Sequence, residues 1–386
     1  MVTKQVLILA SVASMIDQFN MPNIKLLKQM GYEVHVACNF VEGNTCSDEQ
    51  ITILKNNLID LNVQFHQIDF KRNVMRLADS IKAYRQVHKL ANDNNYKFIH
   101  CHSPIGGVVG RLVGKATKTK VIYTAHGFHF YKGAPLKNWL IYYPIEKWLS
   151  KYTDVLITIN KEDYERAKKK FKAKTVERVP GVGIDVKKFN SVEVDRKAKL
   201  REIGIPEDSF VILSVGELNK NKNHEVIIKA IAKISNSQIH YVICGQGPLK
   251  NNLTELVKRL NLINQVHLLG FRDDVTSIYK ICDIFAFPSL REGLGLSALE
   301  AMASELPIIT SNVHGIVDYS INGLTGYSSE PNNVDAFSEA IKNLMNNKDI
   351  IEEIGRGNYE RVRLFDVNIV IKKMRDIYNS KIINLG

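Results

Sequence analysis

The chain has 386 residues, a length typical of two domains, and its 45% hydrophobic and 24% charged residues are those of an ordinary globular protein. No apolar run reaches the roughly 18 residues that a membrane-spanning helix needs, and five scattered cysteines argue against a disulfide framework or a zinc site. Residues 1–190 hold 29 Lys and Arg against 16 Asp and Glu, whereas residues 191–386 hold 23 against 24. The basic first half is expected to attract nucleic acid or anionic lipid, since both offer the same long-range negative field.

The first apolar stretch, which follows Lys4, is similar to a signal peptide because small residues come after it. We interpret it as a buried strand from Gln5 to Ala10, followed by a loop and a helix. The next strand-like run, Tyr32–Cys38, lies where a β-α-β unit would place it, and cleavage would remove that unit's first strand.

Short, β-branched and nearly continuously apolar runs alternate with helical ones along the chain, which is typical of parallel strands buried on both faces. Those of the first half are QVLILA, YEVHVAC, KFIHCH, KVIYTAHG and DVLITIN, and those of the second are FVILSVGE, IHYVICGQG, VHLLGF, DIFAFPS and PIITS. The pattern predicts an α/β fold of two doubly wound parallel-sheet units. The break lies near Glu177–Leu200, which is rich in Pro, Gly and charge. We expect domains at 1–190 and 191–365, with a helix in 366–386 that packs back on the first.

Histidines gather near the strand ends of the first half. His126 ends one strand-like run, while His100 and His102 would share a face of another, with His129 close by. No carboxylates or paired thiols complete a metal site, so we predict no metal there. A histidine at a strand end is also often simply hydrogen-bonded, and the pattern alone leaves that alternative open.

Two segments of the first half combine features of a membrane-binding surface. Pro135–Tyr152 mixes Trp and Tyr with lysines, and Arg166–Lys174 is densely basic. Aromatic and basic residues together suit the headgroup boundary of an anionic membrane, to which we expect the basic half to dock. The alternative is a core helix followed by a solvated charged face, and Pro144 is expected to interrupt the helix.

In the second half, Glu292 and Glu300 flank two glycines and a helical run. Ser297 and Glu300 form a Ser-x-x-Glu capping-box pattern, which predicts a helix start at Ser297 and offers Glu300 a purely structural role. Gly293 and Gly295 would let the backbone approach a ligand, and a helix N-terminus attracts negative charge. The pattern therefore predicts an anion site, most plausibly for phosphate. Because Glu292 would repel a phosphate, we expect it to face a hydroxyl-rich part of the ligand.

REGLGLSALEAMASELPIITS resembles the Glu-x7-Glu signature of retaining glycosyltransferase family 4, with Leu294 in place of the usual Phe. The segments SVGELNKNKNHEVIIKAIAKI, VICGQGPLKNNL and LLGFRDDVTSIYKICDIFAFPS follow that family's order and spacing. KFIHCHSPIGGVVGRL and YTAHGFHFYKGAP are similar to its subgroup for bacterial capsular polysaccharide and exopolysaccharide. The resemblance implies the GT-B fold, with two facing Rossmann-like domains and a cleft between them. It assigns the acceptor to the first domain and the nucleotide sugar to the second.

The resemblance also implies roles for individual residues. Glu300 would bind the ribose hydroxyls and Glu292 would lie by the donor sugar. Lys222 would contact the diphosphate and stabilise the leaving group, and His126 would reach across the cleft to the donor sugar. The backbone N–H groups of Gly293, Leu294, Gly295 and Leu296 would face sugar hydroxyls and diphosphate.

The chain departs from the family pattern at two places. Glu217 stands where the family has an arginine, five residues before Lys222, and the candidates to replace that arginine at the diphosphate are Lys220 and Arg272. The first loop reads SVASMIDQFNMP and lacks the usual Gly-Gly pair. GFRDDV is expected to place backbone near the nucleobase, and GQGP to form a tight turn.

From this resemblance we expect a retaining hexosyltransferase that moves a sugar from a nucleotide donor, a UDP-sugar, to a polyprenyl-diphosphate-linked sugar. The alternatives are a nucleotide-sugar epimerase or hydrolase on the same fold, and a sugar-binding protein, which would have no use for a diphosphate site. No nucleic-acid-reading motif is present. We expect no cofactor and no metal, and a cytoplasmic enzyme held peripherally on the inner face of the plasma membrane.

Overall fold

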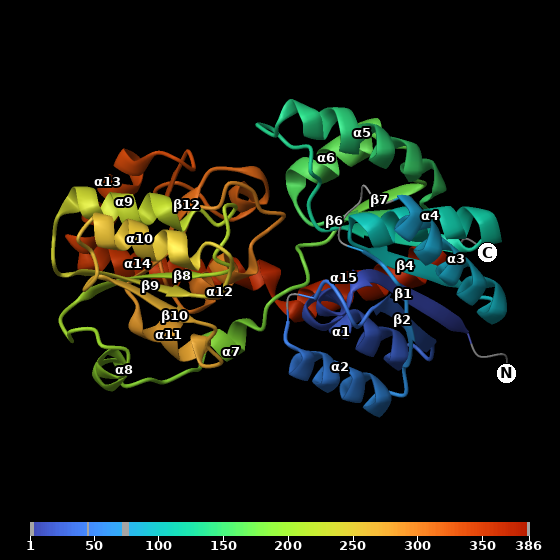
Figure 1. Ribbon diagram of the computed structural model, residues 1–386, viewed down its shortest axis with the longest axis horizontal. Coiled ribbons are helices and arrows are strands. Elements are labelled where there is room, and N and C mark those ends of the chain that lie inside the picture. Colours follow the sequence, from blue (N-terminus) through green and yellow to red (C-terminus); the bar gives the residue numbers. More distant parts are fainter. Residues whose placement is uncertain (1–3, 45, 72–76, 384–386) are drawn as a thin grey trace. The chain divides into compact units, whose positions relative to one another are not determined.

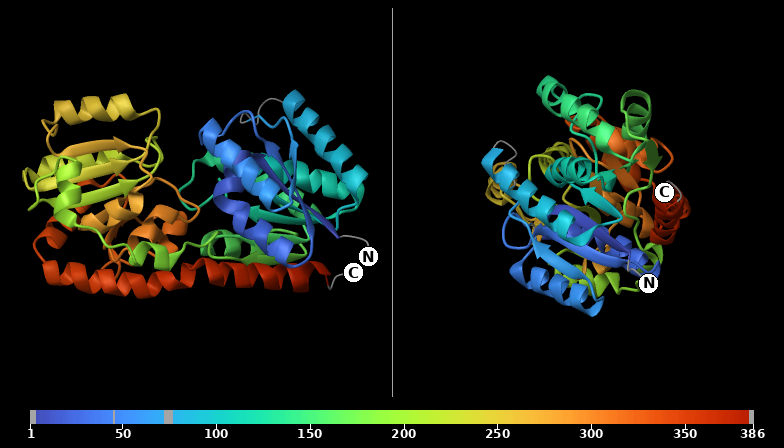
Figure 2. Two further views of the ribbon diagram at one scale, coloured as in Figure 1. Left: turned by 90° about the horizontal axis from the view of Figure 1, so that it is seen from below. Right: turned by 90° about the vertical axis from the view of Figure 1, so that its right-hand side faces the viewer.

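The computed structural model describes residues 4–44, 46–71 and 77–383. Residues 1–3 of the predicted first domain and residues 384–386 of the predicted C-terminal helix lie outside the described residues. The chain divides into two compact units: unit 1 comprises Met1–Val182 with Asn368–Gly386, and unit 2 comprises Gly183–Val367. Each unit is a parallel sheet whose two faces are covered by helices (Figures 1 and 2).

Unit 1 has a seven-stranded sheet in the order β3-β2-β1-β4-β5-β6-β7. Its strands are β1 Gln5–Val12, β2 Glu33–Asn39, β3 Gln64–Gln67, β4 Phe98–His102, β5 Lys120–Ala125, β6 Val155–Thr158 and β7 Thr175–Arg178. Its helices are α1 Ala13–Gln29, α2 Asp48–Asp60, α3 Leu77–Asn94, α4 Pro104–Thr117, α5 Leu136–Leu149, α6 Lys161–Lys170 and α15 Val367–Ile377, with a short π-helical end at Tyr378–Ile383.

Alternation along β1 explains why both faces of this sheet are buried. Val6 and Ile8 point into one core, which α1, α2 and α15 complete, whereas Leu7 and Leu9 point into the other, which α3 and α4 complete. Since successive strand residues face opposite sides, a continuous apolar run is what a doubly covered strand requires. Met374 of α15 and Tyr378 of the π-helical end lie in the first core, so the C-terminal segment packs on unit 1.

Unit 2 has a six-stranded sheet in the order β10-β9-β8-β11-β12-β13. Its strands are β8 Phe210–Val215, β9 Ile239–Cys244, β10 Val266–Gly270, β11 Ile284–Phe287, β12 Ile308–Ser311 and β13 Gly326–Ser329. Its helices are α7 Val186–Asn190, α8 Arg196–Glu202, α9 His224–Ile234, α10 Lys250–Arg259, α11 Val275–Ile281, α12 Leu296–Ala303, α13 Val334–Met345 and α14 Lys348–Val362, with 3-10 turns at His314–Asp318 and Arg363–Phe365.

The predicted α/β class with two doubly wound parallel sheets is confirmed, and each of the ten predicted runs contains a strand. Two local expectations were wrong. No loop separates the first strand from its helix, because β1 extends to Val12 and α1 begins at Ala13. Pro144 does not interrupt α5, which runs continuously from Leu136 to Leu149.

Candidate functional site

The loop after β8 is held at the carboxyl edge of the unit 2 sheet by backbone contacts. The Gly216 and Leu218 N–H groups donate to the carbonyls of Cys244 and Gln246. A Cβ on Gly245 would lie 1.9 Å from the Gly216 carbonyl oxygen, so only glycine fits there. The GQGP segment therefore packs closely against this loop, and its turn lies at Pro248–Leu249, where the Lys250 N–H donates to the Gly247 carbonyl.

The same loop places Lys222 next to Glu292. Lys222 Nζ lies 2.7 Å from Glu292 Oε1, and both side chains are largely but not fully buried. Lys222 Nζ also lies 4.8 Å from the centre of the Phe287 ring. Asn221 fixes the pairing, because its Nδ2 donates to the Arg291 carbonyl at 2.9 Å. Two residues that are 70 positions apart thus meet at the ends of neighbouring strands.

Helix α12 begins one residue earlier than predicted, and its cap is different. Leu296 is its first residue, and the N-cap is Gly295, with φ at 93° and no side-chain capping bond. The predicted Ser297–Glu300 capping box is therefore wrong. A Cβ on Gly295 would lie 2.5 Å from Phe287 Cε1, so glycine is required both by its positive φ and by this close packing. The backbone at residues 293–296 leads into the helix N-terminus, where the first N–H groups have no intrahelical acceptor.

Glu300 faces a buried tyrosine rather than the start of its own helix. Tyr279 Oη donates to Glu300 Oε2 at 3.0 Å and also reaches the Ser297 carbonyl. Burial raises the pKa of Glu300, while the Tyr279 hydrogen bond and the charge of Lys188 oppose that rise. No sequence motif singles out Tyr279, because it occupies an apolar position of a short helix.

The backbone around Glu292 is supported by a second segment, Gly315–Tyr319, which carries no recognisable sequence signal. The Gly315 N–H donates to the Glu292 carbonyl, and a Cβ on Gly315 would lie 1.9 Å from the Gly293 carbonyl oxygen. Tyr319 follows on the same segment. Its hydroxyl is buried, has no hydrogen-bond partner among the described atoms, and lies 3.0 Å from the position that a Cβ on Gly295 would take. Tyr319 could thus hydrogen-bond a ligand at this loop.

The two cations suggested as substitutes for the missing arginine are placed differently. The Arg272 guanidinium donates to Asp274 at 2.7 Å and to Glu202 at 2.8 Å, and these ion pairs would have to break before it could contact a diphosphate. Lys220 is exposed and lines a cavity of about 820 Å³ together with Asn219 and Arg259. Of the described residues that line this cavity, none is Lys222, Glu292 or Glu300.

In unit 1, His126 follows β5 directly and lies against a second histidine. His126 Nε2 is 3.1 Å from His102 Nδ1, and its ring packs against Phe19 with 5.4 Å between the ring centres. His102 Nε2 is buried without a partner among the described atoms. His100 instead bonds the Tyr378 and Thr124 hydroxyls at 2.9 and 2.8 Å. His102 and His126 line a cavity of about 20 Å³, room for roughly one water molecule.

Burial keeps these histidines neutral. It lowers the pKa of His126 to about 4 and that of His100 to about 3, and it lowers the pKa of His102 well below its usual value. A neutral imidazole has one N–H donor and one acceptor, so His126 is suited to hydrogen-bonding a hydroxyl rather than to balancing an anion. In the part of the chain that the structure describes, no three His, Cys, Asp or Glu side chains are grouped to hold a metal ion.

Nearly the whole chain is similar to known glycosyltransferases. Residues 195–361 match the family described as "Glycosyl transferases group 1", and residues 5–160 match "Glycosyl transferase 4-like". "Putative glycosyltransferase EpsD" of Bacillus subtilis is 34% identical over 98% of this chain and 97% of its own length.

Two further relatives and a solved structure extend the comparison. The Escherichia coli "UDP-Gal:alpha-D-GlcNAc-diphosphoundecaprenol alpha-1,3-galactosyltransferase" is 30% identical over 81% of this chain and 82% of its own. The Staphylococcus aureus "Capsular polysaccharide biosynthesis glycosyltransferase CapM" is 26% identical over 82% and 84%. The crystal structure of Anabaena Alr3699/HepE in complex with UDP-glucose covers 97% of this chain and 99% of its own, at 17% identity and a TM-score of 0.79, and shares the fold. The chain belongs to the group 1 glycosyltransferases, the retaining family 4 with the GT-B fold.

Proposed function

We propose that this glycosyltransferase moves a sugar from a UDP-sugar to a polyprenyl-diphosphate-linked sugar in the synthesis of a bacterial surface polysaccharide. The observation that carries the proposal is the Lys222–Glu292 pair beside the N-terminus of α12. A cation, a carboxylate and the backbone N–H groups of a helix N-terminus within one small region match the diphosphate and hydroxyl groups of a nucleotide sugar.

The relatives support the choice of donor and acceptor. The name of the Escherichia coli relative gives a UDP-linked galactose as donor and a diphosphoundecaprenol-linked sugar as acceptor. The Anabaena protein with the same fold was crystallised with UDP-glucose. Both point to a uridine diphosphate as the leaving group.

In this proposal, donor binding redistributes the contacts of the pair. The Lys222 ammonium group then also contacts the diphosphate, whose negative charge grows as the glycosidic bond breaks. Glu292 then accepts hydrogen bonds from donor-sugar hydroxyls. The backbone N–H groups of residues 293–296 donate hydrogen bonds to other oxygens of the sugar and the diphosphate. Glu300 accepts from the ribose hydroxyls while Tyr279 holds the other side of its carboxylate. Arg272 remains a proposed donor-binding residue, and its ion pairs with Glu202 and Asp274 would have to break before it could contact the donor.

For unit 1 we propose acceptor binding, with neutral His126 hydrogen-bonding the donor sugar during transfer. The proposed functions follow the predicted domains. Residues 1–190 recognise the acceptor, residues 191–365 recognise the donor, and the C-terminal helix in 366–386 packs back on the first domain. The tight His102–His126 contact holds the His126 ring in one orientation.

A lipid-linked acceptor requires that the enzyme work at a membrane surface. None of the helices in the described part of the chain is long and apolar enough to cross a bilayer. We propose peripheral attachment to the inner face of the plasma membrane through unit 1, which holds 31 Lys and Arg against 16 Asp and Glu. Anionic lipid attracts such a surface.

The test is transfer by the purified protein from a panel of UDP-sugars, with and without polyprenyl-diphosphate-linked acceptors. The expected product is a glycolipid with the donor's anomeric configuration retained, formed only when both substrates are present. Equal consumption of the donor with and without acceptor would instead indicate a hydrolase or epimerase.

A further inference from the structure

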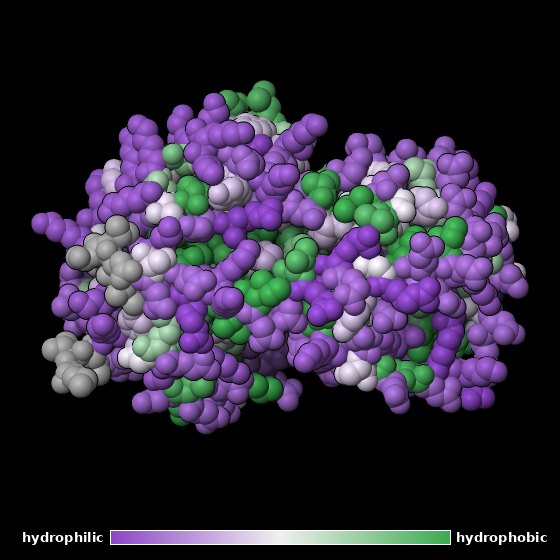
Figure 3. Space-filling model, turned by 180° about the vertical axis from the view of Figure 1, so that it is seen from behind, coloured by the Kyte–Doolittle hydropathy of each residue, from purple (hydrophilic) through white to green (hydrophobic). Residues whose placement is uncertain are grey.

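Helix α5 presents an unusual surface, because almost everything that it exposes is apolar. Leu136 and Leu140 are 73% and 68% exposed, and Trp148 is 45% exposed. The full exposed set on this helix is Leu136, Lys137, Leu140, Ile141, Pro144, Ile145, Lys147 and Trp148. It contains six apolar side chains, two lysines and no acid. Figure 3 shows hydrophobic side chains at the upper edge of unit 1, above a mostly hydrophilic surface.

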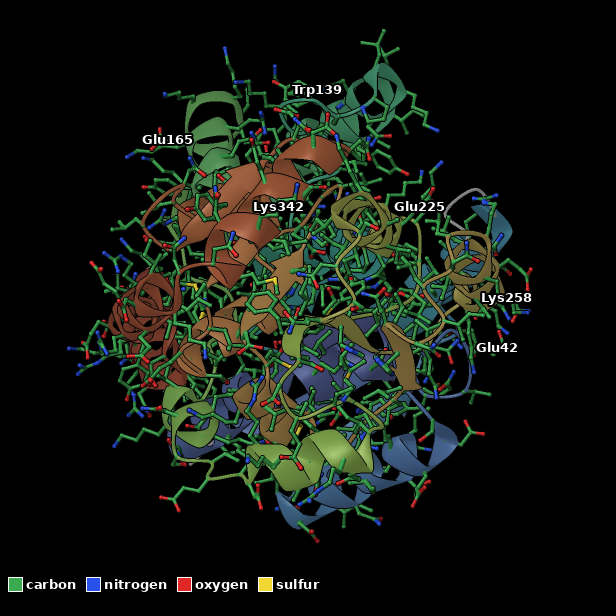
Figure 4. The ribbon with its side chains drawn as sticks, turned by 90° about the vertical axis from the view of Figure 1, so that its left-hand side faces the viewer. Glu42, Trp139, Glu165, Glu225, Lys258 and Lys342 are labelled. Carbon is green, nitrogen blue, oxygen red and sulfur yellow. The ribbon has the colours of Figure 1, made fainter. Side chains whose placement is uncertain are left out.

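The opposite face of α5 packs against the rest of unit 1, so the exposed side chains are not part of the core. Glu146, the only acid of the helix, is buried and forms a two-pronged ion pair with Arg111 at 2.7 and 3.1 Å. Trp139 packs against Phe130 and lies under the Arg166 guanidinium (Figure 4 labels Trp139). A helix that carries apolar side chains on both its faces is normally buried on both, yet this one is buried on only one.

The charges around α5 indicate what covers the exposed side. Lys132 precedes the helix and Lys151 follows it, and both are exposed like Lys137 and Lys147 on the helix itself. Lysine stems can lie along an apolar surface while their ammonium groups reach phosphates. Aliphatic and aromatic side chains with flanking lysines match the boundary between anionic headgroups and acyl chains better than they match a protein partner.

We propose that α5 lies in the headgroup boundary of an anionic membrane, with Leu136, Leu140, Ile141, Ile145 and Trp148 inserted below the phosphates. This inference rests on the proposed function, because a lipid-linked acceptor lies in the same membrane. The helix is also tied to the segment that follows His126. His129 stacks on Tyr142 with 4.6 Å between ring centres, and its carbonyl accepts from Asn138. Membrane binding at α5 would therefore fix the loop beside a predicted active-site histidine.

Trp148 provides a direct test, since the chain has only two tryptophans and the other, Trp139, is half-buried among aromatic rings. Without any substrate, the protein is mixed with vesicles of phosphatidylcholine and phosphatidylglycerol, or of phosphatidylcholine alone. We expect a blue shift of tryptophan emission and quenching by lipids brominated on their acyl chains, only with the anionic vesicles. Trp148→Phe should bind the vesicles but lose both signals. Vesicle binding with unchanged emission and no quenching in the parent protein would overturn the inference.

A matched pair of charge substitutions tests the apolar contribution. Ile141→Glu on α5 should lower vesicle binding by about tenfold or more, since it removes one buried aliphatic side chain and adds an anion beside anionic lipid. Ile263→Glu in unit 2, at a site that is 63% exposed against 54% for Ile141, should leave binding unchanged. Equal loss of binding in both variants, or in neither, would contradict insertion of α5.

Two further measurements separate this inference from its alternatives. Sedimentation velocity without lipid should show a monomer for the parent protein and for Ile141→Glu. A dimer that this substitution dissociates would assign the α5 surface to a second copy of the chain instead. Transfer to a short-chain, water-soluble acceptor should be the same in Ile141→Glu and in the parent. Transfer without vesicle binding would refute the docking surface alone, whereas insertion of α5 without transfer from any UDP-sugar would refute the proposed acceptor reaction alone.

Discussion

Unit 1 and unit 2 share one architecture, a parallel sheet with helices on both faces, but they use charge differently. Unit 1 holds 31 Lys and Arg and 16 Asp and Glu, a net of +15, whereas unit 2 holds 21 and 24, a net of −3. The predicted ligand groups differ as well, since unit 1 offers buried neutral histidines and unit 2 offers a lysine paired with a carboxylate. The net charge of a unit therefore does not indicate which unit carries the predicted diphosphate site. The less basic unit carries the predicted diphosphate site, and the excess charge lies on the unit with the exposed apolar helix.

The strongest test of this contrast is Lys222→Ala in unit 2. We expect turnover to fall by about 10²–10³-fold, because the departing diphosphate loses a stabilising charge in a confined site. The control is Lys220→Ala, which removes an exposed cation two residues away. The measurement is the transfer rate at saturating donor. A rate close to that of the parent for Lys222→Ala, with a large loss for Lys220→Ala, would move the diphosphate role to Lys220.

The surface charge of unit 1 can be tested by changing Lys168, Lys169 and Lys170, all exposed at the end of α6, to Gln. Each basic residue near an anionic surface contributes about 1 kcal/mol, so vesicle binding should fall by up to about 100-fold at low salt. Sedimentation with vesicles at increasing salt measures this, and the difference from the parent should shrink as screening rises. A loss of binding that is independent of salt would show that the lysines contribute to the structure of unit 1 rather than to electrostatic attraction.

The buried histidines of unit 1 predict a dependence of stability on pH. Burial lowers the folded-state pKa of His100 to about 3, below its value of about 6.5 in an unfolded chain. Between these values the unfolded state binds more protons, so stability is complete above about pH 6.5 and falls as the pH falls. Each such histidine contributes about 1.4 kcal/mol per pH unit in that window.

Calorimetric unfolding at pH 7 and pH 5 measures this effect, and His100→Gln should reduce the difference between the two. An unfolding midpoint that is the same at both pH values in the parent protein would show that the histidines are not kept neutral by burial.

Glu300→Gln tests whether the carboxylate of unit 2 binds the donor. Affinity for UDP should fall by about tenfold, because a neutral amide is a weaker acceptor for ribose hydroxyls than a carboxylate. Helix α12 should stay folded, since its cap is Gly295 and not the Ser297–Glu300 pair. Calorimetric titration with UDP gives the affinity, and Ser297→Ala serves as the control, with stability and affinity unchanged. An unaltered UDP affinity in Glu300→Gln would remove Glu300 from the donor site.

The smallest expected effect is that of a chelator. If Lys222 and the N-terminus of α12 balance the diphosphate charge, EDTA should leave the transfer rate unchanged. Restoration of a lost rate by added Mg²⁺ or Mn²⁺ would show that unit 2 needs a divalent ion in addition to its lysine.

Much of the fold followed from the sequence because buried parallel strands must be apolar on both faces. The three strands that were overlooked, β3, β7 and β13, are all at sheet edges, where QFHQ, TVER and GYSS need no continuous apolar run. The Pro144 prediction failed for a different reason. Packing of Trp139 and the buried Arg111–Glu146 pair hold α5 together through a residue whose local preference is against it.

The sequence by itself determined the two α/β units, the family and the short segments on which the predicted site residues lie, because periodicity and motif spacing are local properties. Only the tertiary structure decided which of those residues meet. Lys222 and Glu292 are 70 positions apart and pair because β8 and β11 are neighbours in the sheet. Tyr279 holds Glu300, and Arg272 is held by Glu202 and Asp274, through contacts that no spacing rule encodes. The exposed side of α5 likewise cannot be identified from its sequence, because apolar residues occur on both faces of the helix and only packing determines which face is buried.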